Sequence, residues 1–279
     1  MPTASSKAMR FKKTRTQNLP LEVASQHRST KWLAIGGASL GAAIALLTHA
    51  PAAWLASAVY AASHGRVQLL QAHGSLWNGS AAVVLAAAAG GSAAMTWPSR
   101  WEWRLRPEGL GLGVQLQSMC CTPVPIRLRA SLSGLEVRPG DLQMPMAVLQ
   151  GLGTPWNTVE MQGNLHFRWQ KLEMFWQQTL LLWQGAVQLK AMRISTRLST
   201  LPEIGSYQID LQGGEQPVAQ VSTLQGPLHL EGSGHMQRGK WRFEGQAYAQ
   251  PEQADALANL LNLLGQRSGD KTKIQWGYQ

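Results

Sequence analysis

The sequence predicts a mainly β protein, in which a single N-terminal transmembrane helix is followed by a curved antiparallel β-sheet domain with one or two short packing helices. Three observations lead to this fold class. One uncharged apolar stretch near the N-terminus is long enough to cross a bilayer. After residue 74, apolar and polar residues mostly alternate with a period of two. Only two short segments there have a helical pattern. We divide the chain into a basic tail (1–31), a transmembrane helix (32–55) and one extracytoplasmic β domain (56–279).

The apolar stretch begins at Trp32 and reaches about Leu55, and no charged residue occurs between Lys31 and Arg66. A helix of about 20 apolar residues crosses the hydrocarbon core of a bilayer. Basic residues that flank such a helix stay on the cytoplasmic side. We therefore expect a cytoplasmic N-terminus, with the chain from about residue 60 onward on the far side of the membrane. The tail carries one acidic residue, Glu22, and the basic residues Lys7, Arg10, Lys12, Lys13, Arg15, Arg28 and Lys31.

The tail also explains the high net charge of the chain, because it holds +6 of the total +10. Topology and contact with anionic lipids account for basic residues beside a membrane. We therefore expect the lipid bilayer as a partner and no nucleic acid. A cleaved signal peptide is the alternative, with Ala56-Ser57-Ala58 as a possible cleavage site. The long tail favours an uncleaved anchor.

The alternating segments predict antiparallel strands with one packed face and one wet face. In one of them, Trp101, Trp103 and Leu105 alternate with charged residues. A parallel sheet would instead show continuous apolar runs. The length suits one domain of about ten strands. Other alternating segments are 124–132, 161–169, 207–212, 228–231 and 241–244, and a short terminal strand is expected around 273–276.

Two helices are expected to plug the open ends of the sheet. The clearer one spans residues 251–264, where Pro251 suits the first turn and Gly265 the position after the end. Acidic residues near its start complement the helix dipole. A shorter one spans residues 145–150 and is ended by Gly151. The longer helix has Glu252 and Asp255 near its start and an apolar stripe of Leu257, Leu260, Leu261 and Leu264.

A weak internal repeat places a glycine two residues before an inward apolar residue. It occurs at Gly74, Gly163 and Gly226. Glycine at such a position permits a tight turn or bulge at the entry to a strand. At the first repeat we expect the ring of Trp77 to be buried and to close one end of the core.

No catalytic, cofactor-binding or metal-ligating set is apparent, so we expect a protein without enzymatic activity, cofactor or metal. The glycines at 109, 111 and 113 are not followed by a helical pattern, so they do not form a dinucleotide loop. His229 and His235 have no clustered cysteine or carboxylate beside them that would complete a metal site.

Cys120 and Cys121 are the two cysteines of the chain, and they are adjacent. A peptide bond holds neighbouring Cα atoms about 3.8 Å apart, closer than in ordinary disulfides. A vicinal disulfide between them therefore requires a turn, which the following Thr122-Pro123 makes plausible. Two unpaired thiols and a bond to a partner chain remain alternatives.

The hexapeptide Gly74-Ser75-Leu76-Trp77-Asn78-Gly79, soon after a single anchor, resembles the G-[ST]-L-W-x-G motif of type II secretion system protein N (general secretion pathway protein N). The resemblance covers roughly residues 30–270 and continues in segments 163–169, 205–211, 224–234, 243–247 and 260–265. The residues that carry the structural motif are Gly74, Ser75, Leu76, Trp77, Gly79, Gly163, Gly226 and Gly232.

This resemblance implies a bacterial inner-membrane protein whose periplasmic domain serves the apparatus that exports folded proteins across the outer membrane. Its implied partners are other type II secretion proteins of the inner membrane and periplasm, and it implies no catalytic residues and no small-molecule ligand. The alternative function is a periplasmic lipid-binding or lipid-transport module. Such modules also combine one N-terminal helix with a curved antiparallel sheet, and an open apolar face of the sheet can hold acyl chains.

Overall fold

The computed structural model describes residues 27–87, 94–154, 156–177, 180–237 and 239–277. The chain forms two compact units, residues 1–48 and residues 49–279. The described part of the first unit is one helix, α1 (His27–Thr48). Most of the predicted basic tail therefore lies outside the described residues, and its last five residues, 27–31, belong to α1.

Helix α1 ends at Thr48, before the predicted end at Leu55, and a second helix, α2 (Ala52–Ala62), follows after a short break. Proline causes the break, because Pro51 has no backbone N–H and disfavours a helical conformation at the residue before it. Pro51 instead forms an isolated antiparallel bridge with Ser75. Among the helices of the described residues, none combines the length and the apolar character needed to span a membrane.

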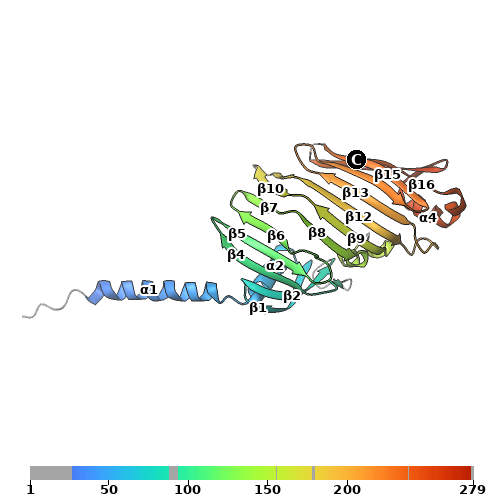
Figure 1. Cartoon of the computed structure of the whole chain (residues 1–279). Coiled ribbons are helices and arrows are strands. Elements are labelled where there is room, and N and C mark those ends of the chain that lie inside the picture. The colour runs from blue at the N-terminus through green and yellow to red at the C-terminus, as the bar shows by residue number, and fades with distance from the viewer. Residues whose placement is uncertain (1–26, 88–93, 155, 178–179, 238, 278–279) are drawn as a thin grey trace, which may run out of the picture. The chain divides into compact units, whose positions relative to one another are not determined.

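The second unit is built on antiparallel strands, as predicted, and its described residues form two nine-stranded sheets. Strands lie beside each other almost in chain order, so most neighbours are joined by hairpins (Figure 1). The first sheet contains β1 (Val67–Gly74), β2 (Asn78–Ala86), β3 (Ala94–Thr96), β4 (Trp101–Glu108), β5 (Gly111–Ser118), β6 (Ile126–Ser131), β7 (Gly134–Val137), β10 (Leu172–Gln177) and β11 (Leu180–Gln184). The second contains β8 (Gly140–Pro145), β9 (Gln162–Trp169), β12 (Ala186–Ser195), β13 (Gly205–Gln212), β14 (Val218–Gln225), β15 (Leu228–Gln237), β16 (Lys240–Ala249), β17 (Gln266–Ser268) and β18 (Lys271–Trp276).

Three bent strands connect the two sheets. The pairs β7–β8, β9–β10 and β11–β12 are each separated by at most two residues, and each pair has one half in either sheet. Backbone hydrogen bonds continue through the bends. Arg138 N donates to Arg127 O at 2.9 Å, and Gly213 N donates to Gly185 O at 2.9 Å. Gly185 has a φ of 121°, a conformation that glycine adopts readily. The prediction of about ten strands is wrong, because the described residues form 18, of which the three bends and the short strands β3 and β17 account for five.

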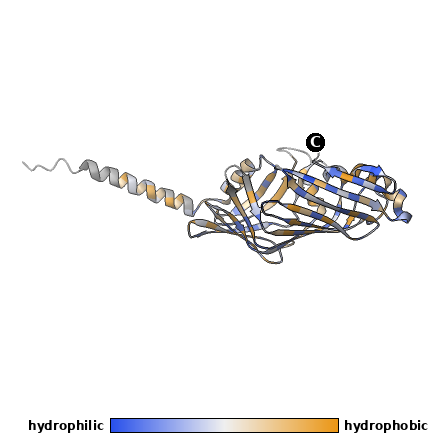
Figure 2. Ribbon diagram, turned by 90° about the horizontal axis from the view of Figure 1, so that it is seen from above, coloured by the Kyte–Doolittle hydropathy of each residue, from blue (hydrophilic) through white to orange (hydrophobic). Residues whose placement is uncertain are grey.

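Alternation of burial along the strands follows the predicted period of two. In β4 the side chain of Trp103 is 4% exposed, whereas those of Glu102 and Arg104 point to solvent. Bands of apolar and polar residues alternate along the strands in Figure 2. In the second sheet, Leu165, Ala191 and Tyr207 are opposite one another on neighbouring strands and are all buried. This face therefore forms one wall of the main core.

Tyr207 is a buried polar anchor in this core. Burial raises the pKa of its hydroxyl, and the charge of Glu203 raises it further, so the side chain is neutral. The hydroxyl group can donate a hydrogen bond to the carbonyl oxygen of Leu228, at 3.0 Å, or to that of Ile204, at 3.2 Å. These contacts tie the loop before β13 to the start of β15.

The C-terminal helix closes one end of this core, as predicted. The chain enters it through a 3₁₀ turn, Pro251–Gln253, and continues as α4 (Ala254–Leu264). Leu257, Leu260 and Leu261 are buried in the same cluster as residues of β9, β12 and β15, and Leu264 packs against that cluster. The helix is therefore an integral part of the β domain.

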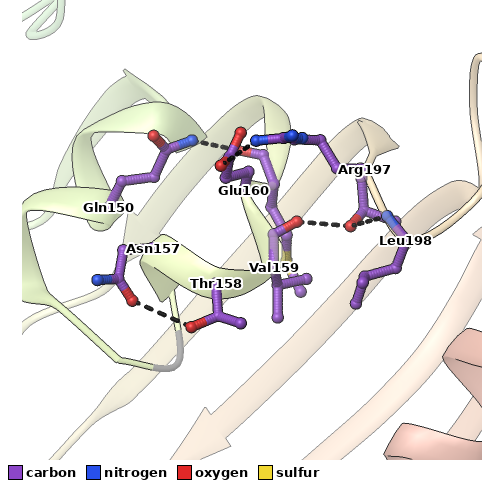
Figure 3. Close-up of polar contacts among 9 residues, drawn as sticks. Gln150, Asn157, Thr158, Val159, Glu160, Arg197 and Leu198 are labelled. Atoms are coloured by element: carbon purple, nitrogen blue, oxygen red, sulfur yellow. Dashed lines mark hydrogen bonds and ion pairs between the residues drawn. The ribbon is translucent and has the colours of Figure 1, made fainter.

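The connection between β8 and β9 covers a neighbouring part of the core. The predicted short helix is a 3₁₀ helix, η1 (Met146–Leu152), and is followed by a turn of helix, α3 (Trp156–Val159). Thr196, in the loop before β13, donates its hydroxyl proton to Val159 O at 2.6 Å. Arg197 forms an ion pair with Glu160 at 2.6 Å (Figure 3). These contacts join the β8–β9 connection to the β12–β13 connection at this end of the sheet.

Replacement of Leu257 by alanine tests the role of α4. Leu257 is 0% exposed, so we expect the free energy of unfolding to fall by about 2–5 kcal/mol. Leu263 on the same helix is 63% exposed, and Leu263→Ala should change the free energy of unfolding by less than about 0.5 kcal/mol. Urea titrations of the full chain measure both. Equal effects of the two substitutions would show that the helix is not docked.

Candidate functional site

The motif that carries the family resemblance forms the turn between β1 and β2. Ser75 N donates to Asn78 O at 2.9 Å, and Asn78 N donates to Ser75 Oγ at 3.1 Å, so the turn closes on itself. Gly74 precedes the turn with a φ of 89°, which a residue with a Cβ rarely adopts. This explains the need for glycine and for a small hydroxyl residue at the first two positions of the motif.

The backbone of this turn holds two other segments. Leu76 N donates to Ala50 O at 2.7 Å, which fixes the segment between α1 and α2 onto the sheet. On the other side, Trp103 Nε1 donates to Leu76 O at 3.0 Å, and Leu105 N donates to Trp77 O at 2.7 Å. The turn is thus a three-way junction between the start of the unit, the β1–β2 hairpin and β4.

The indole of Trp103 occupies space that is free because residue 79 is a glycine without a side chain. A Cβ at position 79 would lie 2.5 Å from Cζ2 of Trp103 and 2.7 Å from His73 O, distances that real Cβ atoms do not show. The indole is buried together with Ala52 of α2 and Ala81 of β2. This second, smaller core attaches α2 to the sheet. The partly buried apolar residues around it are Leu55, Leu69, Ala72, Leu105 and Leu116.

The expectation that Trp77 is buried is wrong, because its side chain is half-buried. Trp103 fills the position that we assigned to Trp77. Trp103 is missed when the motif is considered by itself, since it is 26 residues away from Trp77 in the sequence. Its place on the apolar face of an alternating segment was the available signal, but that pattern does not show which strand lies beside the turn.

The other motif glycines lie in the second sheet and are also crowded. Gly163, with a φ of 129°, lies opposite an irregularity in β12, where a Cβ would approach Met192 O at 2.8 Å. Gly226, with a φ of 117°, packs against the backbone of Gly205. Gly232 lies under the ring of Phe243. These glycines allow close packing at separate points and do not join the β1–β2 turn in one site.

A disulfide joins Cys120 and Cys121 in the structure, within the turn between β5 and β6. Thr122 Oγ1 accepts a hydrogen bond from Ser118 N at 2.8 Å, which stabilises the turn. The carbonyl oxygen of the buried Cys121 accepts a hydrogen bond from Gln143 N in β8 at 2.7 Å. The cysteine turn of the first sheet therefore contacts the second sheet at this point. The oxidation state of the two cysteines in the cell stays a prediction.

Within the described ranges, no group of three or more histidine, cysteine, aspartate or glutamate side chains is placed to hold a metal ion. His229 instead stacks on the ring of Tyr248, with centroids 4.8 Å apart. Gly109 lies in the turn between β4 and β5, and Gly111 and Gly113 lie in β5, with no helix after them. The geometry of a dinucleotide-binding loop is therefore not formed there.

Two antiparallel sheets with crowded glycine turns define a β-sheet scaffold, in which the motif residues position the backbone. The family model for protein N of the type II secretion system (T2SS) matches residues 65–275. Because this range covers most of the chain, the chain belongs to the type II secretion system protein N family. A comparison with curated proteins found no match, and a comparison with solved structures found none.

Replacing Gly79 by alanine tests the junction. We expect the new Cβ to displace the indole of Trp103 and to lower the free energy of unfolding by about 1–3 kcal/mol. Limited proteolysis between residues 49 and 66 should become faster, because the segment held by the turn is released. Asn78→Ala is the matched control, since the bonds of Asn78 in the turn come from its backbone. If both variants resist urea and protease equally, the proposed role of Gly79 is excluded.

Proposed function

We propose that this protein is a non-enzymatic, structural component of the type II secretion apparatus, anchored in the bacterial inner membrane with its β domain in the periplasm. The family match over residues 65–275 carries the proposal, because it spans the whole β-sheet architecture. In this role the domain contacts other secretion proteins of the inner membrane and periplasm. Its contribution is the geometry of a rigid surface, and no chemical step is required of it.

The N-terminal charge pattern supports the membrane anchor. Seven basic residues precede the uncharged stretch between Lys31 and Arg66, an arrangement that favours a cytoplasmic N-terminus. The hydrogen bond from Leu76 N to Ala50 O then has a mechanical meaning. It attaches the chain immediately after α1 to the sheet, so that an anchored N-terminus is connected to the folded domain without a long free linker.

A sheet edge near the C-terminus supports the contact with partners. Strand β17 pairs with residues 271–273 of β18, whereas in the described structure residues 274–276 pair with β16 alone. An edge with free backbone groups can add a strand from another protein. Trp276, at the end of this edge, is 75% exposed and offers an apolar contact beside it.

Deletion of the gene in a bacterium that uses this apparatus tests the role in secretion. We expect a secreted substrate to accumulate in the periplasm, and the full-length chain supplied on a plasmid should restore its release into the medium. Normal secretion after deletion, together with failure of the chain to co-purify with any secretion protein, would refute the proposal.

Fusion of alkaline phosphatase after Arg66 tests the topology. The enzyme is active on the periplasmic side, so we expect an active fusion at this point and an inactive fusion before Lys31. The reverse pattern would place the β domain in the cytoplasm, against the interpretation of the basic tail.

A lipid-binding module is a second candidate, and the inner face of the second sheet favours it. By register, Trp169, Val187 and Leu211 continue the face of the buried Leu165, Ala191 and Tyr207, yet they are only half-buried. Acyl chains can cover such an apolar strip. Native mass spectrometry of the purified chain, followed by lipid extraction, separates the two candidates. A stoichiometric lipid would favour the second, and a lipid-free chain that co-purifies with secretion proteins would favour the first.

A further inference from the structure

Two neighbouring hairpin tips of the first sheet each end in an almost fully exposed leucine. Leu110, between β4 and β5, is 95% exposed, and Leu132, between β6 and β7, is 98% exposed. Both hairpins are tight, because Glu108 pairs with Gly111 and Ser131 pairs with Gly134. The register of β5 and β6 continues from Leu112 opposite Ala130 toward the tips, so the two leucines lie at the same end of adjacent hairpins.

Turn geometry does not explain the leucine at position 110. A third tight hairpin joins β17 and β18 through Gly269-Asp270, with Ser268 paired to Lys271. Gly269 has a φ of 64°, close to the 61° of Gly109 in the turn that contains Leu110. A glycine with nearly the same φ is thus followed by aspartate in one turn and by leucine in the other. The exposed leucine is a feature of the surface and has no role in closing the hairpin.

Arginines lie directly behind the two tips, on the outer face of the sheet. In the register, Arg106 and Arg129 flank Gly113 on either side, and in the next row Arg104 and Arg127 flank Gln115. All four side chains are exposed, and within the described residues none of them forms an ion pair. A Cβ at Gly109 would lie 3.4 Å from Nη2 of Arg129, which places this guanidinium group beside the tip.

Acidic residues on this face are fewer than the basic ones and are partly compensated by other cations. Glu108 lies 3.6 Å from Nη2 of Arg138, while Lys171 is shared between Glu173 at 2.5 Å and Glu136 at 3.6 Å, both in the row of Arg129. Glu102 is exposed at the other end of β4, away from the tips. The four arginines therefore leave an excess of positive charge next to the two leucines.

We infer that these tips and arginines form a docking surface for an anionic phospholipid bilayer. Leucines that project singly from hairpin tips can enter the boundary between headgroups and acyl chains, while the guanidinium groups behind them bind lipid phosphates. Protein interfaces place their apolar residues in a packed, contiguous patch, which two isolated tips do not provide. The inference goes beyond the proposed function, since a secretion component need not touch the bilayer with its β domain.

A probe at the tips of the full-length chain tests this inference independently of the N-terminal segment. Leu132→Cys is labelled with the environment-sensitive fluorophore NBD, without reductant, and the unsubstituted chain serves as the labelling blank. Asp270→Cys carries the same probe on the control hairpin. We expect the probe at 132 to shift to the blue and to be quenched by doxyl lipids in vesicles of equimolar phosphatidylglycerol and phosphatidylcholine. At 270 it should remain in water.

Charge is tested in the labelled Leu132→Cys chain. Replacing both Arg106 and Arg129 by glutamine should raise the lipid concentration at half-maximal response about tenfold, as should pure phosphatidylcholine vesicles. The double substitution Lys240→Gln and Lys273→Gln removes two charges from the second sheet. It should leave the lipid concentration at half-maximal response unchanged. A probe at 132 that stays in water, responds equally to neutral vesicles, or responds only when a purified secretion protein is added without lipid would overturn the inference.

Discussion

The antiparallel pairing of the bent strands, which links the first sheet to the second through single backbone hydrogen bonds at the bends, is the constraint on which the rest of the β domain depends. Three strands bend at the same level, and bonds such as the one from Gln170 N to Ala186 O preserve the pairing there. Because neighbouring strands within each sheet are paired in register, the register of each hairpin fixes the faces of the next one. A slip of one residue at any strand would turn apolar side chains of the core toward solvent. The core, the arginine face and the open edge at β18 all depend on this register.

Close packing of backbone at glycine positions lets the two cores form on this framework. In the smaller core, Gly79 provides the space for Trp103, and the indole N–H then holds the turn through Leu76 O. In the larger core, the ring of Phe243 lies across Gly232 of the neighbouring strand. In both places an aromatic ring occupies the volume that a side chain on the adjacent strand would need. The glycines of the family motif are thus explained by packing, and their substitution acts on stability before it acts on any contact with a partner.

Much of the fold is predictable from the sequence, because alternation and capping are local signals. The strands around Trp103 and the stripe that contains Leu257 follow directly from these patterns. The bends were missed because nothing in the alternation marks them: at Gly185 the chain moves from one sheet to the other within a single residue. The burial of Trp77 was predicted wrongly because it depends on which strand lies beside the turn. That neighbour, β4, is set by long-range pairing and not by the motif itself.

Register also explains why charged residues that look unremarkable in the sequence can form a surface. Arg104 and Arg106 on β4, and Arg127 and Arg129 on β6, each alternate with apolar residues, as on any half-exposed strand. Pairing through Gln115 and Gly113 of β5 brings the two pairs into adjacent rows, and the carboxylate of Glu108 lies over Gly113 between Arg106 and Arg129. In this ladder the apolar face of the second sheet is used by the core, apart from the half-buried strip at Trp169, Val187 and Leu211. The outer face, the hairpin tips and the free edge are the parts of the scaffold that can change without loss of the core.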